Sequence, residues 1–201
     1  MNPVSNSHVA IVLAAGGSSR LGTPKQLLKR GGETLVHRAV RLAAATQPHR
    51  LSLVIGAYAE EIRTAVADLQ VEILVNDDWR EGLASSVRVA ADALDESASA
   101  LILGCDQPAL ELGHLQRLLT EAAASVSGCA ATRHGVGRGI PVAVSAAVLR
   151  EAHGLRGDSG LRGLLQWLPS DSFYLLEAVE LEFDLDTLGD VEKAVADGLL
   201  D

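Results

Sequence analysis

The sequence has few aromatic residues and few cysteines, and both shortages limit what the protein can be. Aromatic side chains make up 3% of the 201 residues although the hydrophobic fraction is 48%, so a core must be built mainly from Ala, Val, Leu and Ile. Two cysteines, Cys105 and Cys129, form no C-x-x-C pair and predict no disulfide framework. The six histidines are scattered without an H-E-x-x-H motif, which argues against a zinc site.

An excess of basic charge and long apolar runs are also missing. The chain has 17 basic and 26 acidic residues and a net charge of -9, whereas broad binding to nucleic acid or to an anionic membrane needs a basic surface. No apolar run reaches the roughly 20 residues that span a bilayer, and residues 1–8 lack the parts of a signal peptide. We therefore expect a cytoplasmic protein with no membrane or nucleic-acid partner. Backbone amides and a few local cations can still hold phosphates in an acidic protein.

The first part of the chain alternates short apolar runs with segments of helical periodicity. The alternation predicts an α/β protein with a mostly parallel sheet. Strands are expected at 8–15, 50–56, 71–76 and 99–106, and helices at 34–45, 59–69, 83–94 and 111–124.

The second part is less regular. No linker, low-complexity tract or internal repeat interrupts it, so we predict a single domain over residues 1–201, with 1–7 as a flexible tail. The pattern predicts strands at 128–133 and 139–145, a helix at 145–152, an amphipathic helix within 157–168, one or two strands within 172–186 and a closing helix at 188–200.

One loop carries the first functional signal. Residues 12–28 read VLAAGGSSRLGTPKQLL, an apolar strand end followed by glycines, serines and two cations. The segment is neither a Walker A loop, because Lys-Ser/Thr does not follow its last glycine, nor a G-x-G-x-x-G fingerprint. Small residues let backbone amides approach an anion closely, and Arg20 and Lys25 add positive charge. These features favour a triphosphate site, with a solvated glycine-rich turn as the alternative.

Several motifs resemble one enzyme family. The string LAAGGSSRLGTPKQLL closely resembles the signature L-A-A-G-x-S-x-R-[ML]-G-x-x-K of nucleotidyltransferases that activate small molecules by joining them to a nucleotide. From about residue 9 to 196, further segments resemble, in order, the molybdenum cofactor cytidylyltransferase group of the MobA-like NTP transferases. These segments are EGLASSVRVA (81–90), LILGCDQPAL (101–110), GRGIPVAVS (137–145), GDSGLRGLL (157–165) and FDLDTLGDVEKA (183–194).

This resemblance implies a fold, a reaction and its partners. The expected fold is the Rossmann-like three-layer α/β/α nucleotidyltransferase fold with a mostly parallel sheet. The implied reaction is Mg²⁺-dependent transfer of a nucleoside monophosphate to a phosphorylated acceptor, with release of pyrophosphate. The LAAG form favours CTP as the donor, and the motif set favours molybdopterin as the acceptor. A molybdoenzyme or a chaperone is the protein partner that such an enzyme would serve.

The resemblance also assigns roles to residues. Arg20, Lys25 and Asp106 are implied to be catalytic, and Asp106 and Asp186 to bind Mg²⁺. Such a transfer must hold several negative charges together, and Mg²⁺ bound by one or two carboxylates and phosphate oxygens suits that task. The residues implied to bind the nucleotide are Leu13, Ala14, Ala15, Gly16, Gly17, Ser18, Ser19, Arg20, Lys25, Gly82, Ser85, Ser86 and Asp106.

Structural alternatives stay open for several of these residues. Asp106 follows an apolar strand, where ligands bind in open α/β sheets, but an aspartate before QPAL also suits a turn or a helix cap. Asp184 is either solvated or an auxiliary carboxylate. Ser85 and Ser86 either cap a helix or contact the nucleotide. The two tryptophans, Trp79 and Trp167, are most simply packing residues.

The chain departs from the family pattern at two positions. Ile140 stands where the family often has histidine before the proline of the G-x-P strand, and Leu188 replaces the proline after D-x-D-T. The first departure falls in the half of the chain where we expect the acceptor to bind. In that half, Asp158 and Arg162 either line the acceptor pocket or form an i, i+4 ion pair on the surface. Residues 133–138 either contact an anionic acceptor or form a solvated loop.

Two other functions compete with the molybdopterin assignment. The same chemistry could serve another phosphorylated acceptor, such as a sugar or alcohol phosphate. Alternatively, the chain is a nucleotide-binding protein without turnover that acts in cofactor delivery or regulation. The presence of Arg20, Lys25, Asp106 and Asp186 together argues against that second alternative. A dehydrogenase is disfavoured because the dinucleotide fingerprint is missing.

Overall fold

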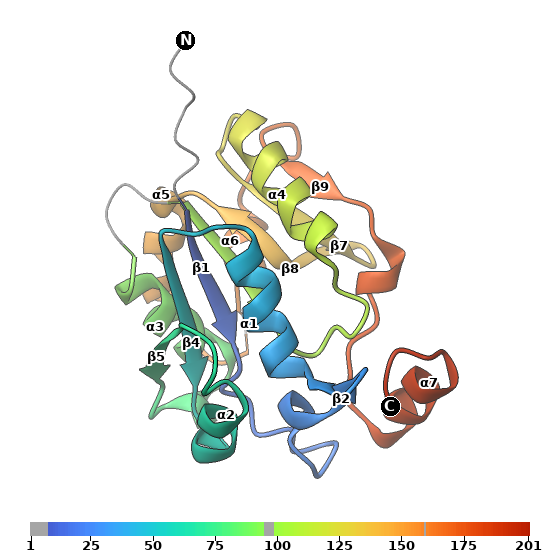
Figure 1. Ribbon diagram of the computed structural model, residues 1–201. Coiled ribbons are helices and arrows are strands. Elements are labelled where there is room, and N and C mark those ends of the chain that lie inside the picture. The colour runs from blue at the N-terminus through green and yellow to red at the C-terminus, as the bar shows by residue number, and fades with distance from the viewer. Residues whose placement is uncertain (1–7, 95–98, 159) are drawn as a thin grey trace.

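A seven-stranded sheet forms the centre of the molecule in the computed structural model, which describes residues 8–94, 99–158 and 160–201 (Figure 1). Its strand order is β5-β4-β1-β6-β8-β7-β9, and β2 and β3 form a separate two-stranded hairpin. The strands are β1 (His8–Leu13), β2 (Lys29–Arg30), β3 (Glu33–Thr34), β4 (Arg50–Ile55), β5 (Glu72–Val75), β6 (Ser99–Gly104), β7 (Ala130–His134), β8 (Gly137–Val144) and β9 (Tyr174–Leu176).

The sheet is mostly parallel, as the sequence predicts. Strand β1 pairs in parallel with β4 and β6, β4 pairs in parallel with β5, and β7 with β9. Among the sheet's described strands, β8 alone runs antiparallel to its neighbours, because a tight turn joins it to β7. The carboxyl ends of β1, β4 and β6 therefore meet at one edge of the sheet.

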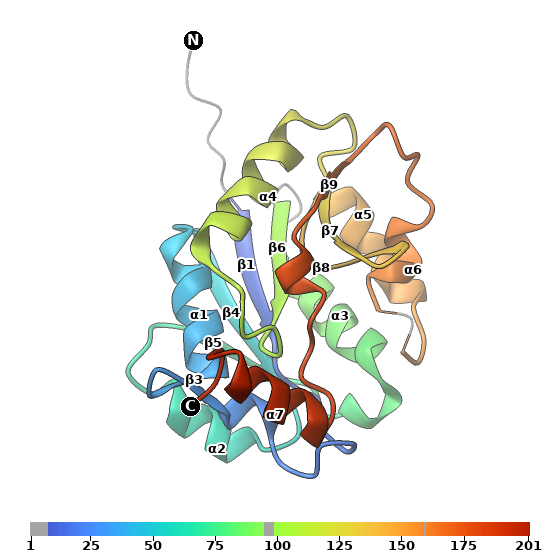
Figure 2. The same ribbon diagram turned by 90° about the vertical axis from the view of Figure 1, so that its right-hand side faces the viewer.

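Helices cover both faces of the sheet and complete three layers (Figure 2). Buried residues of α1, α2 and α4 pack on one face, and those of α3, α5 and α6 pack on the other. No helix in the described part of the chain is long and apolar enough to cross a bilayer. The helices are α1 (Leu35–Ala45), α2 (Ala59–Ala65), α3 (Leu83–Asp92), α4 (Leu112–Ala124), α5 (Ala146–Arg150), α6 (Arg162–Leu165) and α7 (Leu188–Ala196).

Side chains of the central strands alternate between the two faces. In β1, Ala10 and Val12 belong to the cluster under α1, whereas Val9 and Ile11 belong to the cluster under α3. All four side chains are fully buried. A strand covered on both faces needs an apolar residue at every position, which explains why the sequence reads as an unbroken apolar run.

Of the one or two strands predicted within residues 172–186, the structure has one, β9. After β9 the chain forms the 3-10 helix Val179–Leu181 and then crosses the carboxyl edge of the sheet. The backbone N–H of Leu185 donates to the carbonyl oxygen of Asp106 at 3.0 Å, and Leu185 is fully buried beside Leu35. A buried crossing segment therefore produced the alternation that resembled a strand.

Other predicted elements are shorter than expected. Helix α6 covers four residues of the segment 157–168, and α7 ends at Ala196 rather than at 200. The loop before α6 is held by tertiary contacts that local periodicity does not show. Residues 1–7, predicted to be a flexible tail, lie outside the described residues, and the single-domain reading of 1–201 stays a prediction.

Because the sheet is buried on both faces, truncation of a central apolar side chain and truncation of an exposed one should change the free energy of unfolding by unequal amounts. Leu101 of β6 is fully buried, so Leu101→Ala should lower the free energy of unfolding by about 2–5 kcal/mol. Val126 is 90% exposed, so Val126→Ala should change the free energy of unfolding by no more than about 0.5 kcal/mol. Urea unfolding followed by circular dichroism measures both. Equal losses in the two variants would contradict the placement of β6 at the centre of the core.

Candidate functional site

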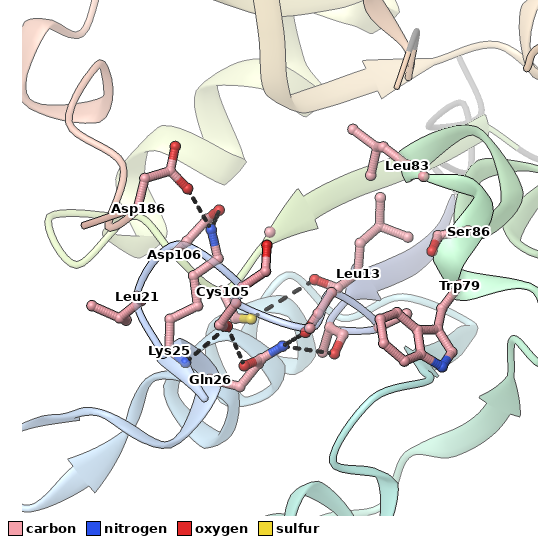
Figure 3. Close-up of a pocket in the computed structure, with 18 of the residues that line it drawn as sticks. Leu13, Leu21, Lys25, Gln26, Trp79, Leu83, Ser86, Cys105, Asp106 and Asp186 are labelled. Carbon is pink, nitrogen blue, oxygen red and sulfur yellow. Dashed lines mark hydrogen bonds and ion pairs between the residues drawn. The ribbon is translucent and has the colours of Figure 1, made fainter. Parts of the chain in front are cut away.

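An open cavity of about 510 Å³ lies at the carboxyl edge of the sheet. Its lining comes from the loop after β1, the start of α3, the end of β6 and the segment before α7 (Figure 3). The cavity brings together all but one of the residues that the sequence assigns to the site. Those that line it are Leu13, Ala14, Ala15, Gly16, Gly17, Ser18, Ser19, Arg20, Lys25, Gly82, Ser86, Asp106 and Asp186, and Ser85 is the exception.

A buried glutamine shapes the loop after β1. Gln26 is 1% exposed, and its amide Nε2 donates to the carbonyl oxygens of Ala14 (3.1 Å) and Gly16 (2.6 Å). The hydroxyl of Ser18 donates to Gln26 Oε1 at 3.3 Å and accepts from the backbone N–H of Lys25 at 3.1 Å. These bonds fix the curve of the loop and the start of the Lys25 side chain. Sequence reasoning missed Gln26, because most glutamines are exposed.

The positive and negative side chains of the site meet at one end of the cavity. Lys25 Nζ lies 2.8 Å from Asp106 Oδ2 and 3.1 Å from Asp186 Oδ1 (Figure 3). Arg20 Nη2 lies 2.8 Å from Asp186 Oδ2. The Lys25 side chain is 17% exposed. Burial alone would lower the pKa of Lys25, but the two carboxylates raise it above its usual value. Lys25 therefore stays charged at neutral pH.

Local hydrogen bonds place Asp186 beside Asp106. The bond from Leu185 N–H to the Asp106 carbonyl holds the crossing segment against the end of β6. Directly after it, Thr187 caps α7, and Asp190 Oδ2 accepts from the backbone N–H of Thr187 (2.7 Å) and of Asp186 (3.1 Å). Two carboxylates 80 residues apart in the sequence are thus held close enough to share one ammonium group.

This pair of carboxylates fits a divalent metal ion. In the described part of the chain, no group of three or more His, Cys, Asp or Glu side chains could hold a metal. Mg²⁺ is usually bound through only one or two carboxylates, with substrate phosphates and water as its other ligands. The ammonium of Lys25 contacts both Asp106 and Asp186, so a small cation at this place can reach both.

Asp184 and Cys105 flank the two carboxylates and have strongly raised pKa values. Burial, followed by the negative charge of Asp106, raises the pKa of Asp184 to about 7. The side chain of Asp184 is half-buried rather than fully solvated, which favours the auxiliary role among the two expected. Burial likewise raises the pKa of Cys105 to about 12, and its thiol donates to the Leu13 carbonyl at 3.8 Å. Cys105 is a packing residue, not a nucleophile.

Trp79 lies at the other end of the cavity (Figure 3). A Cβ on Gly17 would come within 2.8 Å of the indole, and one on Gly56 within 2.7 Å of Trp79 Cβ. Both positions therefore need glycine, because the indole packs directly on the backbone. The guanidinium of Arg80 lies 4.3 Å from the centre of the indole. The sequence identified Trp79 only as a packing residue, whereas it both packs on the core and lines the cavity.

The two serines at the start of α3 have different positions. Asn76 is buried and donates from Nδ2 to Ser85 Oγ at 2.8 Å and to Ser86 Oγ at 3.0 Å. Ser86 lines the cavity, but Ser85 is 2% exposed and donates to the Gly82 carbonyl at 2.8 Å. Ser85 is thus a buried structural serine that neither lines the cavity nor caps α3, whose N-cap is Gly82, whereas Ser86 faces the cavity and is available to a ligand.

The residues considered for acceptor binding separate into two groups. Ile140 and Asp158 line the cavity, and Ile140 packs against the end of β6 beside Gly104. Arg162 does not line it, and its guanidinium lies against Gly137. No ion pair joins Asp158 to Arg162 among the described residues, so the i, i+4 alternative is wrong.

The residues of the 133–138 turn are engaged elsewhere. Arg133 pairs with Glu177 at 2.6 Å, and Arg138 donates to the carbonyl oxygens of Leu165 and Leu168. These bonds hold the two arginines away from the cavity, while the tip of the turn is solvated, with Val136 fully exposed. The cations that line the cavity in the described part of the chain are Arg20, Lys25 and Arg80.

The shared ammonium predicts competition between Lys25 and metal ions. Lys25→Met removes a positive charge from between two carboxylates, so free Mn²⁺ should bind the variant about tenfold more tightly than the original chain. Electron paramagnetic resonance of Mn²⁺ measures this without nucleotide or turnover. Lys29→Met, which removes an exposed lysine outside the cavity, should leave Mn²⁺ binding unchanged. Weaker Mn²⁺ binding by Lys25→Met would show that the carboxylates do not form the metal site.

Solved structures share the fold over nearly the whole chain. A nucleotidyl transferase from Methanothermobacter superposes with a TM-score of 0.82 and 26% identity, covering 97% of this chain and 99% of that one. A manganese complex of the Mycobacterium tuberculosis protein Rv0371c superposes with a TM-score of 0.77 and 26% identity, covering 94% and 98%. The Rossmann-like nucleotidyltransferase fold expected from the motifs is confirmed.

Sequence comparison gives the family. Nicotine blue oxidoreductase of Paenarthrobacter nicotinovorans is 34% identical over 158 residues, which cover 76% of this chain and 71% of that protein. The bifunctional protein GlmU of Kineococcus radiotolerans is 34% identical over 165 residues, but the match spans only 31% of its length. The family model described as "MobA-like NTP transferase domain" matches residues 10–172. The chain belongs to the MobA-like NTP transferase family.

Proposed function

We propose that the protein is a Mg²⁺-dependent nucleotidyltransferase. An oxygen of a phosphorylated acceptor attacks the α-phosphorus of a nucleoside triphosphate, the bond to the bridging oxygen breaks, and pyrophosphate leaves. The observation that supports this most strongly is the Lys25 ammonium held between Asp106 and Asp186 at the end of the glycine-rich loop. The same end of the cavity thus contains cations that can bind phosphates and carboxylates that can bind a metal ion.

The chain's own residues supply binding and charge neutralisation. Asp106 and Asp186 would hold Mg²⁺, and the bound ion would supply neutralisation of phosphate charge and polarisation of the phosphorus–oxygen bonds. Lys25 and Arg20 exchange their carboxylate partners for phosphate oxygens when the nucleotide binds. The small residues 14–19 let backbone amides contact the triphosphate. Once Lys25 and Arg20 have changed partners on nucleotide binding, they and the backbone amides face the phosphates and stabilise the charge that develops during the transfer.

The substrates follow from the motifs rather than from the cavity. The LAAG form and the ordered motifs of the molybdenum cofactor group support CTP as donor and molybdopterin as acceptor. A molybdoenzyme or a chaperone that receives the product, a cytoplasmic location and a single domain over 1–201 belong to the same proposal. Ile140 in the cavity wall, where the family often has histidine, keeps another acceptor, such as a sugar or alcohol phosphate, as the alternative.

A redox function is the second candidate. Its basis is the 34% identity to a protein named nicotine blue oxidoreductase. The two cysteines of this chain are both buried, so they offer no exposed dithiol. The combination of Lys25, Asp106 and Asp186 supports phosphate chemistry instead. Oxidation of NADH by the purified protein in the presence of a quinoid dye, without pyrophosphate release in any assay, would favour the redox candidate.

Nucleotidyl transfer predicts a specific pattern of pyrophosphate release. The purified chain is incubated with Mg²⁺ and CTP, GTP, UTP or ATP, each with and without molybdopterin. Release should be fastest with CTP and should depend on molybdopterin. Release with another phosphorylated acceptor but not with molybdopterin would overturn the acceptor assignment alone. Binding of CTP without release for any acceptor would favour the non-catalytic alternative.

Loss of the first carboxylate should remove turnover but not the fold. Asp106→Ala deletes one metal ligand and one partner of Lys25, so the rate of pyrophosphate release should fall on the order of 10²–10³-fold or more. Asp171→Ala removes an exposed carboxylate outside the cavity and should leave the rate unchanged. Circular dichroism confirms that both variants are folded. A near-normal rate for Asp106→Ala would contradict its metal role.

A further inference from the structure

Among the cavity residues that the structure describes, Asp158 is the one carboxylate that the proposed mechanism does not use. It comes from the loop between the 3-10 helix Glu151–Gly154 and α6, its residue is exposed, and it lines the same cavity as Lys25 and Asp106. We propose that Asp158 accepts hydrogen bonds from the ribose hydroxyls of the bound nucleotide and so selects ribonucleotides over deoxyribonucleotides. This inference rests on the proposed nucleotide-binding function.

The loop that carries Asp158 is fastened to α3. The carbonyl oxygen of Gly157 accepts from the backbone N–H of Ala84 at 2.9 Å. Arg88, one turn further along α3, donates to the carbonyl oxygen of Leu155, also at 2.9 Å. Bonds on both sides of residue 156 hold the loop against the first turns of the helix. The backbone directly before Asp158 is therefore held in place before any ligand binds.

Gly82 brings the Asp158 carboxylate directly onto the cavity wall. Gly82 has a φ of +115°, which side chains of L-residues rarely adopt. A Cβ there would lie 2.7 Å from the carbonyl carbon and oxygen of Gly157 and would also collide with Asp158 Oδ1. The carboxylate thus lies against bare backbone immediately before the ten-residue helix α3. The amino end of a helix favours an ionised carboxylate.

The charges in the cavity distinguish Asp158 from the other two carboxylates. Asp106 and Asp186 are compensated by Lys25 and Arg20. No cation pairs with Asp158 among the residues that the structure describes. An ionised carboxylate only accepts hydrogen bonds, and it repels phosphate. It therefore fits a part of the ligand that is uncharged and carries O–H or N–H donors.

A nucleoside triphosphate offers such donors at the sugar. Two adjacent hydroxyls match the two oxygens of a carboxylate, and acidic residues bind ribose hydroxyls in dinucleotide-binding folds for the same reason. The phosphate end of the cavity is marked by Lys25 and the far end by Trp79 (Figure 3). The sugar, which joins phosphate to base, must lie between these ends. Gly82 lies three residues after Trp79 and also lines the cavity. Because Asp158 packs against Gly82, its carboxylate lies in the part of the cavity where the sugar is expected.

The test is equilibrium binding of nucleotides without an acceptor, so that no turnover is required. Isothermal titration calorimetry with Mg²⁺ compares CTP, 2′-deoxy-CTP and UTP on the original chain, Asp158→Ala and Asp158→Asn. Asp171→Ala is the matched control, because it removes an exposed carboxylate outside the cavity. The original chain should bind CTP about tenfold or more tightly than 2′-deoxy-CTP, as expected for a charged hydrogen bond. Asp158→Ala should lose about that factor for CTP and show no ribose preference, and Asp158→Asn should lie between the two.

Four results would overturn the inference. If Asp158→Ala keeps the ribose preference, the carboxylate does not bind the sugar. If it keeps the ribose preference but loses a preference for CTP over UTP, the carboxylate contacts the amino group of the base instead. If the original chain binds CTP and 2′-deoxy-CTP equally, no ribose selection exists. If the original chain binds none of the nucleotides, the proposed function fails as well, which separates the two failures.

Discussion

The contact of one ammonium group with two carboxylates determines how the site is built. Lys25 follows the first strand, Asp106 follows the fourth parallel strand of the core, and Asp186 precedes the last helix. Bringing two carboxylates together in a partly buried place is unfavourable unless a cation compensates them. Lys25 supplies that cation in the absence of other ligands, and its own pKa rises as a result. The same place is therefore suited to a divalent ion whenever a phosphate draws the ammonium away.

The fold provides this contact through a few precise backbone features. The carboxyl ends of the parallel strands lie at one edge of the sheet. The hydrogen bond between Leu185 and Asp106 holds the segment before α7 at that edge. Gln26 fixes the curve of the loop that carries Lys25. Glycines are essential where another group lies on the backbone, as Trp79 does at Gly17 and the 157–158 segment does at Gly82. Because these groups pack directly on the glycine backbone, the cavity wall is closely packed at these points. The chain needs few aromatic side chains to achieve this.

Much of this could be predicted from the sequence, because local patterns carry it. Unbroken apolar runs predicted the buried parallel strands, and the ordered motifs predicted the loop, Asp106 and Asp186. For 172–186 the pattern could not decide between one strand and two, because a chain that crosses the sheet edge with Leu185 buried has the same alternation as a strand. Gln26 was missed because a buried glutamine that binds backbone carbonyls has no sequence pattern of its own, and for Trp79 the sequence predicted its packing but not its place in the cavity wall. Ser85 shows the converse, since its motif suggested a ligand and its bond to Asn76 shows a buried structural serine.

The central claim is that the triphosphate loop and the two carboxylates form a single metal–nucleotide site. A crystal structure of the chain with Mn²⁺ and a non-hydrolysable CTP analogue, with anomalous data collected for manganese, tests it most directly. The account predicts one manganese peak in contact with Asp106, Asp186 and phosphate oxygens, with Lys25 Nζ moved onto a phosphate oxygen. Manganese bound away from these carboxylates, or Lys25 still bridging Asp106 and Asp186 with the nucleotide in the cavity, would contradict the account.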